Sequence, residues 1–148
     1  MSYSFGEASQ ARLKGLHPDL VRVLEQAIAH STLDFTIIEG VRSAQRQMEL
    51  YAQGRTKPGP IVTWLKVSNH MAKADGYGYA VDLYPYPVSL VLGAKPKSYE
   101  PLFDELAQVM FAAAKACGVK LRWGADWDMD NMPRERGETD NPHFELRK

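Results

Sequence analysis

Tyr79-Ala80-Val81-Asp82-Leu83-Tyr84 is the stretch that most clearly predicts a β-strand, because its side chains alternate as those of a strand do. Pro85 and Pro87 follow and end the strand. An acid, Asp82, lies between the apolar residues of this strand. A buried carboxylate is costly unless a positive group meets it, and a bound divalent cation would be such a group. The strand therefore supplies both a piece of a sheet and a candidate for chemistry.

Hydrophobic spacing and helix-breaking residues predict further elements on both sides of this strand. Helices are expected at residues 18–30, 43–53 and 101–117, where Ser43 is the N-cap of the second, Pro101 fits the first turn of the third and Gly118 ends it. Strands are expected at residues 34–39, 61–67, 119–123 and 143–147. Helices come first and strands cluster late, which favours an α+β fold with a small antiparallel sheet packed with about three helices.

Length and composition predict a single domain over residues 1–148. The chain has 45% hydrophobic and 24% charged residues, which is typical of a globular protein. Eighteen basic and 18 acidic residues give a net charge of zero, so neither nucleic acid nor an anionic membrane is expected as the principal partner. One cysteine excludes an internal disulfide. No stretch approaches the roughly 20 apolar residues of a membrane span, and the first residues lack a secretory pattern, so folding in a cytoplasm is expected.

Two of the four histidines, His70 and His143, are candidates for a metal site together with carboxylates. Asp140 precedes His143 by three residues across an Asn-Pro turn, and His70 precedes Asp82. Two imidazoles and one carboxylate for a metal, with a second carboxylate outside the coordination shell, are the parts of a hydrolytic metal site. Each signal is ordinary when taken alone: a single loop histidine is usually solvated, and Asp140 could simply begin the turn. The spacing leaves both interpretations open.

The motifs Ser68-x-His70, Gly78-x-Ala80-x-Asp82 and Asp140-x-x-His143, in this order, resemble the zinc peptidases that cleave next to D-amino acids in peptidoglycan, the D-Ala-D-Ala carboxypeptidase and dipeptidase group. The chain is more similar still to the phage endolysin branch, the L-alanyl-D-glutamate endopeptidases. Two further blocks, residues 39–56 and Trp123-Gly124-Ala125-Asp126-Trp127, are similar to segments of that family. The resemblance covers residues 38–145.

The sequence departs from the family between the first histidine and the aspartate. Eleven residues separate His70 from Asp82, whereas the family usually has six. The extra residues fit an inserted loop around residues 71–76, and they make Asp75 a rival ligand. Asp82 is preferred because it ends the Gly-x-Ala-x-Asp motif and lies in a predicted strand.

The resemblance implies a role for each matching residue. It implies a zinc ion held by His70, Asp82 and His143, with Asp140 as the general base. Arg42 is expected to stabilise the negative charge that develops on the scissile carbonyl oxygen. Substrate contacts are expected from Ser68, Gln45 and Trp123, although Ser68 could be an ordinary loop residue and core packing is the first interpretation of the indole. An acidic loop with Asp126, Asp128, Asp130 and Glu135 could hold calcium, but it does not follow the EF-hand spacing.

These implications predict a zinc-dependent endopeptidase that hydrolyses the L-Ala-D-Glu bond of murein stem peptides during phage or prophage lysis. The enzyme is expected to be a monomer without a separate wall-binding domain or membrane insertion. It would stay in the host cytoplasm until a separate protein releases it to the cell wall in the periplasm. The alternatives are a D-Ala-D-Ala carboxypeptidase of the same group and a non-catalytic wall-binding domain. A non-haem iron oxygenase is a third, although its histidine and carboxylate usually lie closer together.

Overall fold

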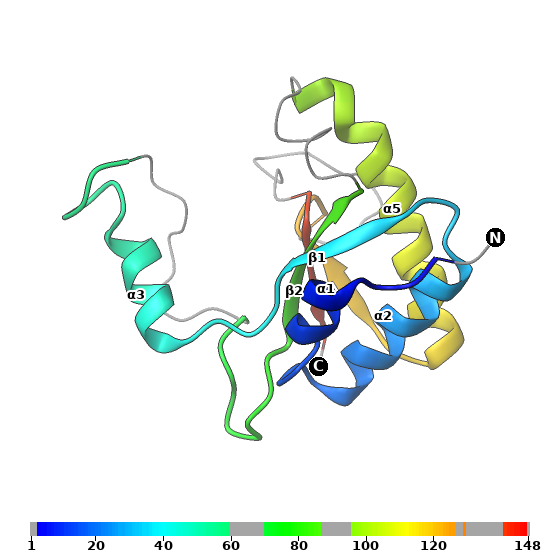
Figure 1. The fold of residues 1–148 in the computed structure, drawn as a ribbon, viewed down its shortest axis with the longest axis horizontal. Coiled ribbons are helices and arrows are strands. Elements are labelled where there is room, and N and C mark those ends of the chain that lie inside the picture. Colours follow the sequence, from blue (N-terminus) through cyan, green and yellow to red (C-terminus); the bar gives the residue numbers. More distant parts are fainter. Residues whose placement is uncertain (1–2, 60–69, 87–95, 127–128, 130–140, 148) are drawn as a thin grey trace.

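The computed structural model describes residues 3–59, 70–86, 96–126, 129 and 141–147. These ranges form an α+β fold in which four helices accompany one four-stranded antiparallel sheet, as predicted (Figure 1). The helices are α1 (Glu7–Arg12), α2 (Pro18–His30), α3 (Ala44–Ala52) and α5 (Pro96–Cys117). The strands are β1 (Phe35–Glu39), β2 (Ala80–Pro85), β3 (Leu121–Trp123) and β4 (His143–Leu146), in the spatial order β1-β2-β4-β3.

The strand register brings polar residues from three strands to one place in the sheet. Asp82 of the central strand β2 pairs with His143 of β4 on one side and with Glu39 of β1 on the other. A register shift between Ile37 and Glu39 brings Glu39 into this row. On its far side, β4 pairs with β3. The sheet thus assembles candidate residues that lie up to about a hundred positions apart in the sequence.

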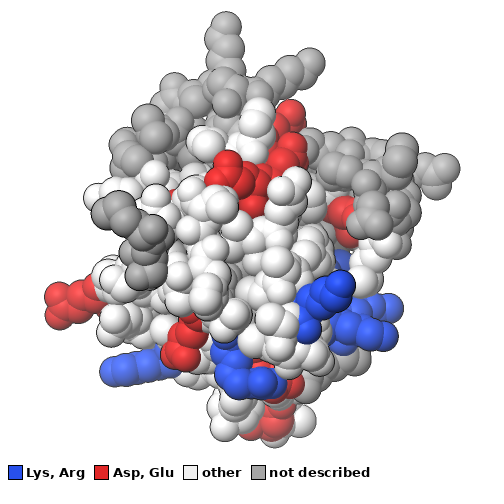
Figure 2. Space-filling model, turned by 90° about the vertical axis from the view of Figure 1, so that its right-hand side faces the viewer, with Lys and Arg blue, Asp and Glu red and all other residues white. Residues whose placement is uncertain are grey.

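Helices α2 and α5 pack against each other on one side of the sheet, whereas α3 stands away from the sheet on the other side (Figure 1). The core between the sheet and the two helices is apolar, and its largest fully buried side chains include Leu20, Leu24, Leu83, Phe103 and Phe144. None of the helices in the described ranges is long and apolar enough to cross a bilayer. Figure 2 shows acidic and basic side chains both present on one face, with uncharged surface over much of its centre.

Several sequence predictions are confirmed at the level of single caps. Helix α2 has the predicted bounds, and the His17 imidazole accepts the backbone N–H of Asp19 at its start. Ser43 caps α3, because its hydroxyl accepts the Arg46 N–H at 3.0 Å. Gly118 follows α5 with a φ of 69°, a left-handed conformation that glycine adopts without a steric penalty.

The predicted start of α5 is wrong. The helix begins at Pro96, five residues before the expected position, and Pro101 lies inside it. Both prolines satisfy the rule that the first turn needs no N–H donor, so the sequence offers two possible starts. The short helix α1 was not predicted, and the strand expected at residues 61–67 lies outside the described ranges.

Candidate metal centre

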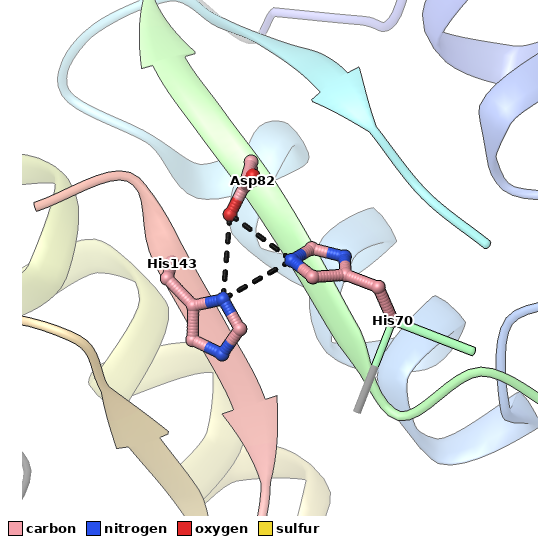
Figure 3. A group of neighbouring side chains, drawn as sticks. All are labelled: His70, Asp82 and His143. Carbon is pink, nitrogen blue, oxygen red and sulfur yellow. Dashed lines mark hydrogen bonds and ion pairs between the residues drawn. The ribbon is translucent and has the colours of Figure 1, made fainter. Parts of the chain in front are cut away.

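Three side chains from separate segments converge beside strands β2 and β4 (Figure 3). His70 Nε2 lies 3.1 Å from His143 Nδ1 and 3.3 Å from Asp82 Oδ1, and the latter two atoms are 3.4 Å apart. Both imidazoles are buried, and the Asp82 side chain is 18% exposed. The structure therefore brings together the three residues that the resemblance assigned to a metal.

The backbone around the cluster is closely packed, and this fixes His70. The Arg42 N–H donates to the His70 carbonyl oxygen at 2.7 Å, and the His70 ring lies against the carbonyl of Gly40. A Cβ atom on Gly40 would lie 2.3 Å from the Arg12 carbonyl oxygen, so only glycine fits there. The segment after β1 thus contacts His70 at both its backbone carbonyl and its imidazole ring.

The outer hydrogen bonds of the two imidazoles define which nitrogen atoms face the centre. His70 Nδ1 lies 3.2 Å from the Gly40 carbonyl oxygen, which can only accept, so Nδ1 carries the proton. His143 Nε2 lies 2.8 Å from Glu145 Oε1, and an ionised carboxylate likewise only accepts. In the neutral rings, the lone pairs of His70 Nε2 and His143 Nδ1 therefore point toward each other and toward Asp82.

The charge state of Asp82 completes this arrangement. Burial raises the pKa of the Asp82 carboxyl. The imidazoles of His143 and His70, when a proton on the inner nitrogen lets them donate to this carboxylate, lower the pKa by more, so that it lies well below the ordinary value. Asp82 Oδ1 is buried and accepts no hydrogen bond of normal geometry within the described residues. Two lone pairs and an anionic oxygen that face one another form a group that could hold a metal cation. Two nitrogen atoms and one oxygen form a ligand set suited to zinc, with one coordination position left for water.

Glu145 is a functional candidate that the sequence reasoning did not identify. Its carboxylate accepts from His143 through Oε1 and from Arg122 Nη2 through Oε2, both at 2.8 Å, and the residue is only 4% exposed. Burial raises the pKa of Glu145, but His143 and Arg122 together lower it below its ordinary value. The spacing of two residues from His143 along a predicted strand was a usable signal, because such residues share one face.

Arg42 is held by two side chains near the start of α3. Its Nε and Nη2 donate to the two carboxylate oxygens of Glu39 at 2.8 Å each, and its Nη1 donates to Gln47 Oε1 at 2.7 Å. The Arg42 side chain is 9% exposed, and Gln47 is fully buried. The guanidinium is thus fixed in one orientation, and its role toward substrate stays a prediction.

The other predicted site residues lie in different surroundings. Trp123 is buried, its indole N–H donates to the Asn141 carbonyl oxygen at 2.7 Å, and its ring stacks on Phe144, which is the core packing considered first. Gln45 is exposed in the first turn of α3. Substrate contact by either residue stays a prediction. Ser68, Asp140 and most of the acidic loop lie outside the described residues.

The rival ligand Asp75 is not part of the cluster. It is exposed, and its carboxylate accepts the Tyr77 N–H and the Tyr79 hydroxyl. Gly76 beside it has a φ of 85°, and its N–H donates to the Lys73 carbonyl, so these residues form a tight turn. The segment between His70 and Asp82 therefore contains a turn, as the inserted-loop interpretation predicted.

Comparisons with known proteins place the chain in one family of peptidases. Residues 1–147 match the family model described as "Phage L-alanyl-D-glutamate peptidase". The chain is 30% identical over 152 residues to the L-alanyl-D-glutamate peptidase of Escherichia phage T5, covering 99% of both chains. It is 32% identical over 136 residues to the Bacillus subtilis peptidoglycan L-alanyl-D-glutamate endopeptidase CwlK, covering 88% of this chain and 73% of that protein. The crystal structure of the Serratia marcescens L-Ala D-Glu endopeptidase ChiX superposes with a TM-score of 0.68 at 28% identity, covering 97% of this chain and 90% of that one.

Proposed function

Because the chain belongs to the phage L-alanyl-D-glutamate peptidase family, we propose that it is a zinc-dependent endopeptidase that hydrolyses the L-Ala-D-Glu bond of peptidoglycan stem peptides. One observation carries the proposal: His70 Nε2, His143 Nδ1 and the ionised Asp82 Oδ1 face one another within 3.4 Å. Such a set binds a divalent cation and leaves a position open for water.

Zinc bound at this site would supply a Lewis acid and a water whose pKa is lowered to about 7. Asp140, three residues before His143, accepts the proton of the attacking water and returns it to the leaving amine. Arg42 stabilises the negative charge on the carbonyl oxygen, because its guanidinium stays charged at any working pH. Three of its five N–H donors bind Glu39 and Gln47, which leaves two for a substrate.

The biological setting follows from the same proposal. The enzyme acts as a monomer on the host cell wall at the end of a phage or prophage cycle. It remains in the host cytoplasm until a separate protein opens the membrane to the periplasm. Its net charge of zero provides no general attraction to a polyanion, so binding to the wall depends on the residues around the metal centre.

Digestion of purified murein tests the proposal directly. The zinc-loaded protein is incubated with murein sacculi, and the new termini are identified by mass spectrometry. Fragments with N-terminal D-Glu are expected. Release of D-Ala would instead indicate the carboxypeptidase alternative, and an absence of products despite bound zinc would indicate a binding domain. The variant Asp82→Asn, which keeps the size of the side chain, is the matched control and should give no products.

A further inference from the structure

His143 and Glu145 are two residues apart on β4, so their side chains lie on the same face of the strand. The register pairs His143 with Asp82 on β2, and it pairs Glu145 with Arg122 on β3. Contacts therefore run across the sheet from Asp82 through His143 and Glu145 to Arg122. The last two contacts of this row, from the His143 imidazole to the Glu145 carboxylate and from that carboxylate to the Arg122 guanidinium, are both 2.8 Å long.

We propose that Glu145 is a positioning residue for the metal centre, which keeps the His143 proton on Nε2 so that Nδ1 presents a lone pair to the metal, and that Arg122 holds the Glu145 carboxylate in place. This inference rests on the metal centre of the proposed function. Nothing in it requires Glu145 to touch the metal or the substrate.

The reason lies in the competing tautomer of His143. With the proton on Nδ1, the ring would donate toward Asp82 Oδ1 at 3.4 Å or toward His70 Nε2 at 3.1 Å. Such a bond would satisfy the cluster without a metal and would block one ligand atom. An ionised Glu145 opposes this tautomer, because a carboxylate accepts a proton donor at Nε2 but cannot donate to a lone pair there.

Arg122 explains how a carboxylate can be kept in this buried position. Glu145 is 4% exposed, and an unpaired charge there would carry a large desolvation cost. Arg122 lies directly across from it on β3, and its own side chain is 27% exposed, so its charge remains partly hydrated. The Arg122 guanidinium therefore compensates the carboxylate and also restrains it from turning away from His143.

Zinc affinity of a matched pair of variants provides the first test. In Glu145→Gln the amide can donate to Nε2 as well as accept from it, so both tautomers of His143 become possible. We expect its zinc dissociation constant, measured by competition with a chromophoric chelator, to rise about 10- to 100-fold. The control is Glu105→Gln on α5, where the carboxylate accepts from the exposed Thr32 hydroxyl at 2.7 Å and contacts none of the residues of the metal centre that the structure describes. This control should bind zinc as the wild type does.

The tautomer itself provides the second test, which needs neither activity nor a variant that folds. Nitrogen-15 NMR of the metal-free wild type, well above the ordinary histidine pKa of about 6.5, should show the His143 proton on Nε2. A proton on Nδ1 would overturn the inference. In Glu145→Gln the Nδ1-protonated form should increase, whereas Glu105→Gln should leave the spectrum unchanged.

The outcomes separate this inference from the function on which it rests. If the wild type binds no zinc, the proposed function fails. If the wild type binds zinc and Glu145→Gln binds it equally well with the same tautomer, the inference fails and the function stands. Should Glu145→Gln not fold, as judged by circular dichroism, Arg122→Gln replaces it. That variant should weaken zinc binding, and an unchanged affinity would count against the inference.

Discussion

The backbone and the side chain of Arg42 make different contacts near the candidate metal centre. Its backbone N–H supports the His70 carbonyl, whereas its guanidinium is fixed by Glu39 and Gln47. Replacing the side chain leaves the backbone bond in place. A substitution at Arg42 can therefore test charge stabilisation separately from metal binding.

Arg42→Ala should reduce turnover by about 100- to 1,000-fold, the usual loss when one oxyanion-stabilising donor is removed. Its zinc content, measured by elemental analysis, should not change. Arg46→Ala is the matched control, because Arg46 is exposed on α3 and its charge lies at the surface, 3.6 Å from the exposed carboxylate of Glu49. If Arg42→Ala retained near-wild-type turnover, the role of this residue would be disproved.

Asp75 offers a pH prediction away from the metal centre. The Tyr79 hydroxyl and, next, the Tyr77 N–H lower the pKa of its carboxyl. A lowered folded-state pKa means that the stabilising bonds are present above the ordinary pKa of about 3.9 and are lost as the pH falls toward the folded value. An NMR titration should find a pKa below the ordinary value in the wild type.

Two tyrosine variants serve as a matched pair for this titration. Tyr79→Phe removes the hydroxyl donor and should return the Asp75 pKa toward its ordinary value. Tyr77→Phe keeps the backbone N–H that contacts Asp75 and should leave the pKa low. If Asp75 had the same pKa in both variants, the hydrogen bond from the Tyr79 hydroxyl would not be what lowers it.

Strand register and the packing of the segment after β1 build the site. Asp82 and His143 meet because β2 and β4 pair in register, and the first histidine meets them because the chain after β1 passes close to α1. Gly40 is the point of closest approach, and its carbonyl accepts from the His70 ring. Backbone packing at an element boundary thus controls the geometry of a predicted metal ligand.

Gly40→Ala should lower the free energy of unfolding by about 1–3 kcal/mol, the usual range for overpacking. The added Cβ would lie 2.3 Å from the Arg12 carbonyl oxygen, so the backbone must move and carry the His70 contact with it. Zinc affinity should fall as well. Gly6→Ala is the control, because nothing lies within 4 Å of a Cβ there and φ is −72°. The free energy of unfolding of the metal-free proteins is measured in urea. Equal values for the two variants would contradict the prediction.

At the scale of the whole molecule, local patterns predicted most of the fold, and long-range packing determined the rest. The alternation of residues 79–84 and the caps at Ser43 and Gly118 were sufficient to place β2 and two helix ends. The start of α5 was missed because Pro96 and Pro101 satisfy the same local rule. Short α1 was missed because six residues give little periodicity.

The candidate site divides in the same way. The motifs predicted the residues that converge, and the two-residue spacing could have placed Glu145 on the same face as His143, but its pairing with Arg122 depends on strand register, which no local pattern reveals. Likewise, the bonds from Arg42 to Glu39 and Gln47 depend on how the chain turns between β1 and α3. Sequence therefore indicated the ligands, and the structure was needed for the groups that orient them.

Zinc should stabilise the whole fold, because a ligand that binds only the folded state shifts the unfolding equilibrium. At a free zinc concentration of 100 times the dissociation constant, the gain should be about 2.7 kcal/mol. Thermal unfolding with and without zinc measures it, and a chelator should reverse it. Asp82→Asn should show no such gain. A zinc effect of equal size in this variant would place the metal elsewhere.

Anomalous diffraction at the zinc absorption edge, from crystals of the zinc-loaded protein, tests the metal centre most directly. A single strong peak is expected among His70 Nε2, Asp82 Oδ1 and His143 Nδ1, with nitrogen and oxygen as the only protein ligands. No peak between these three atoms, or a peak at another set of residues alone, would contradict the account.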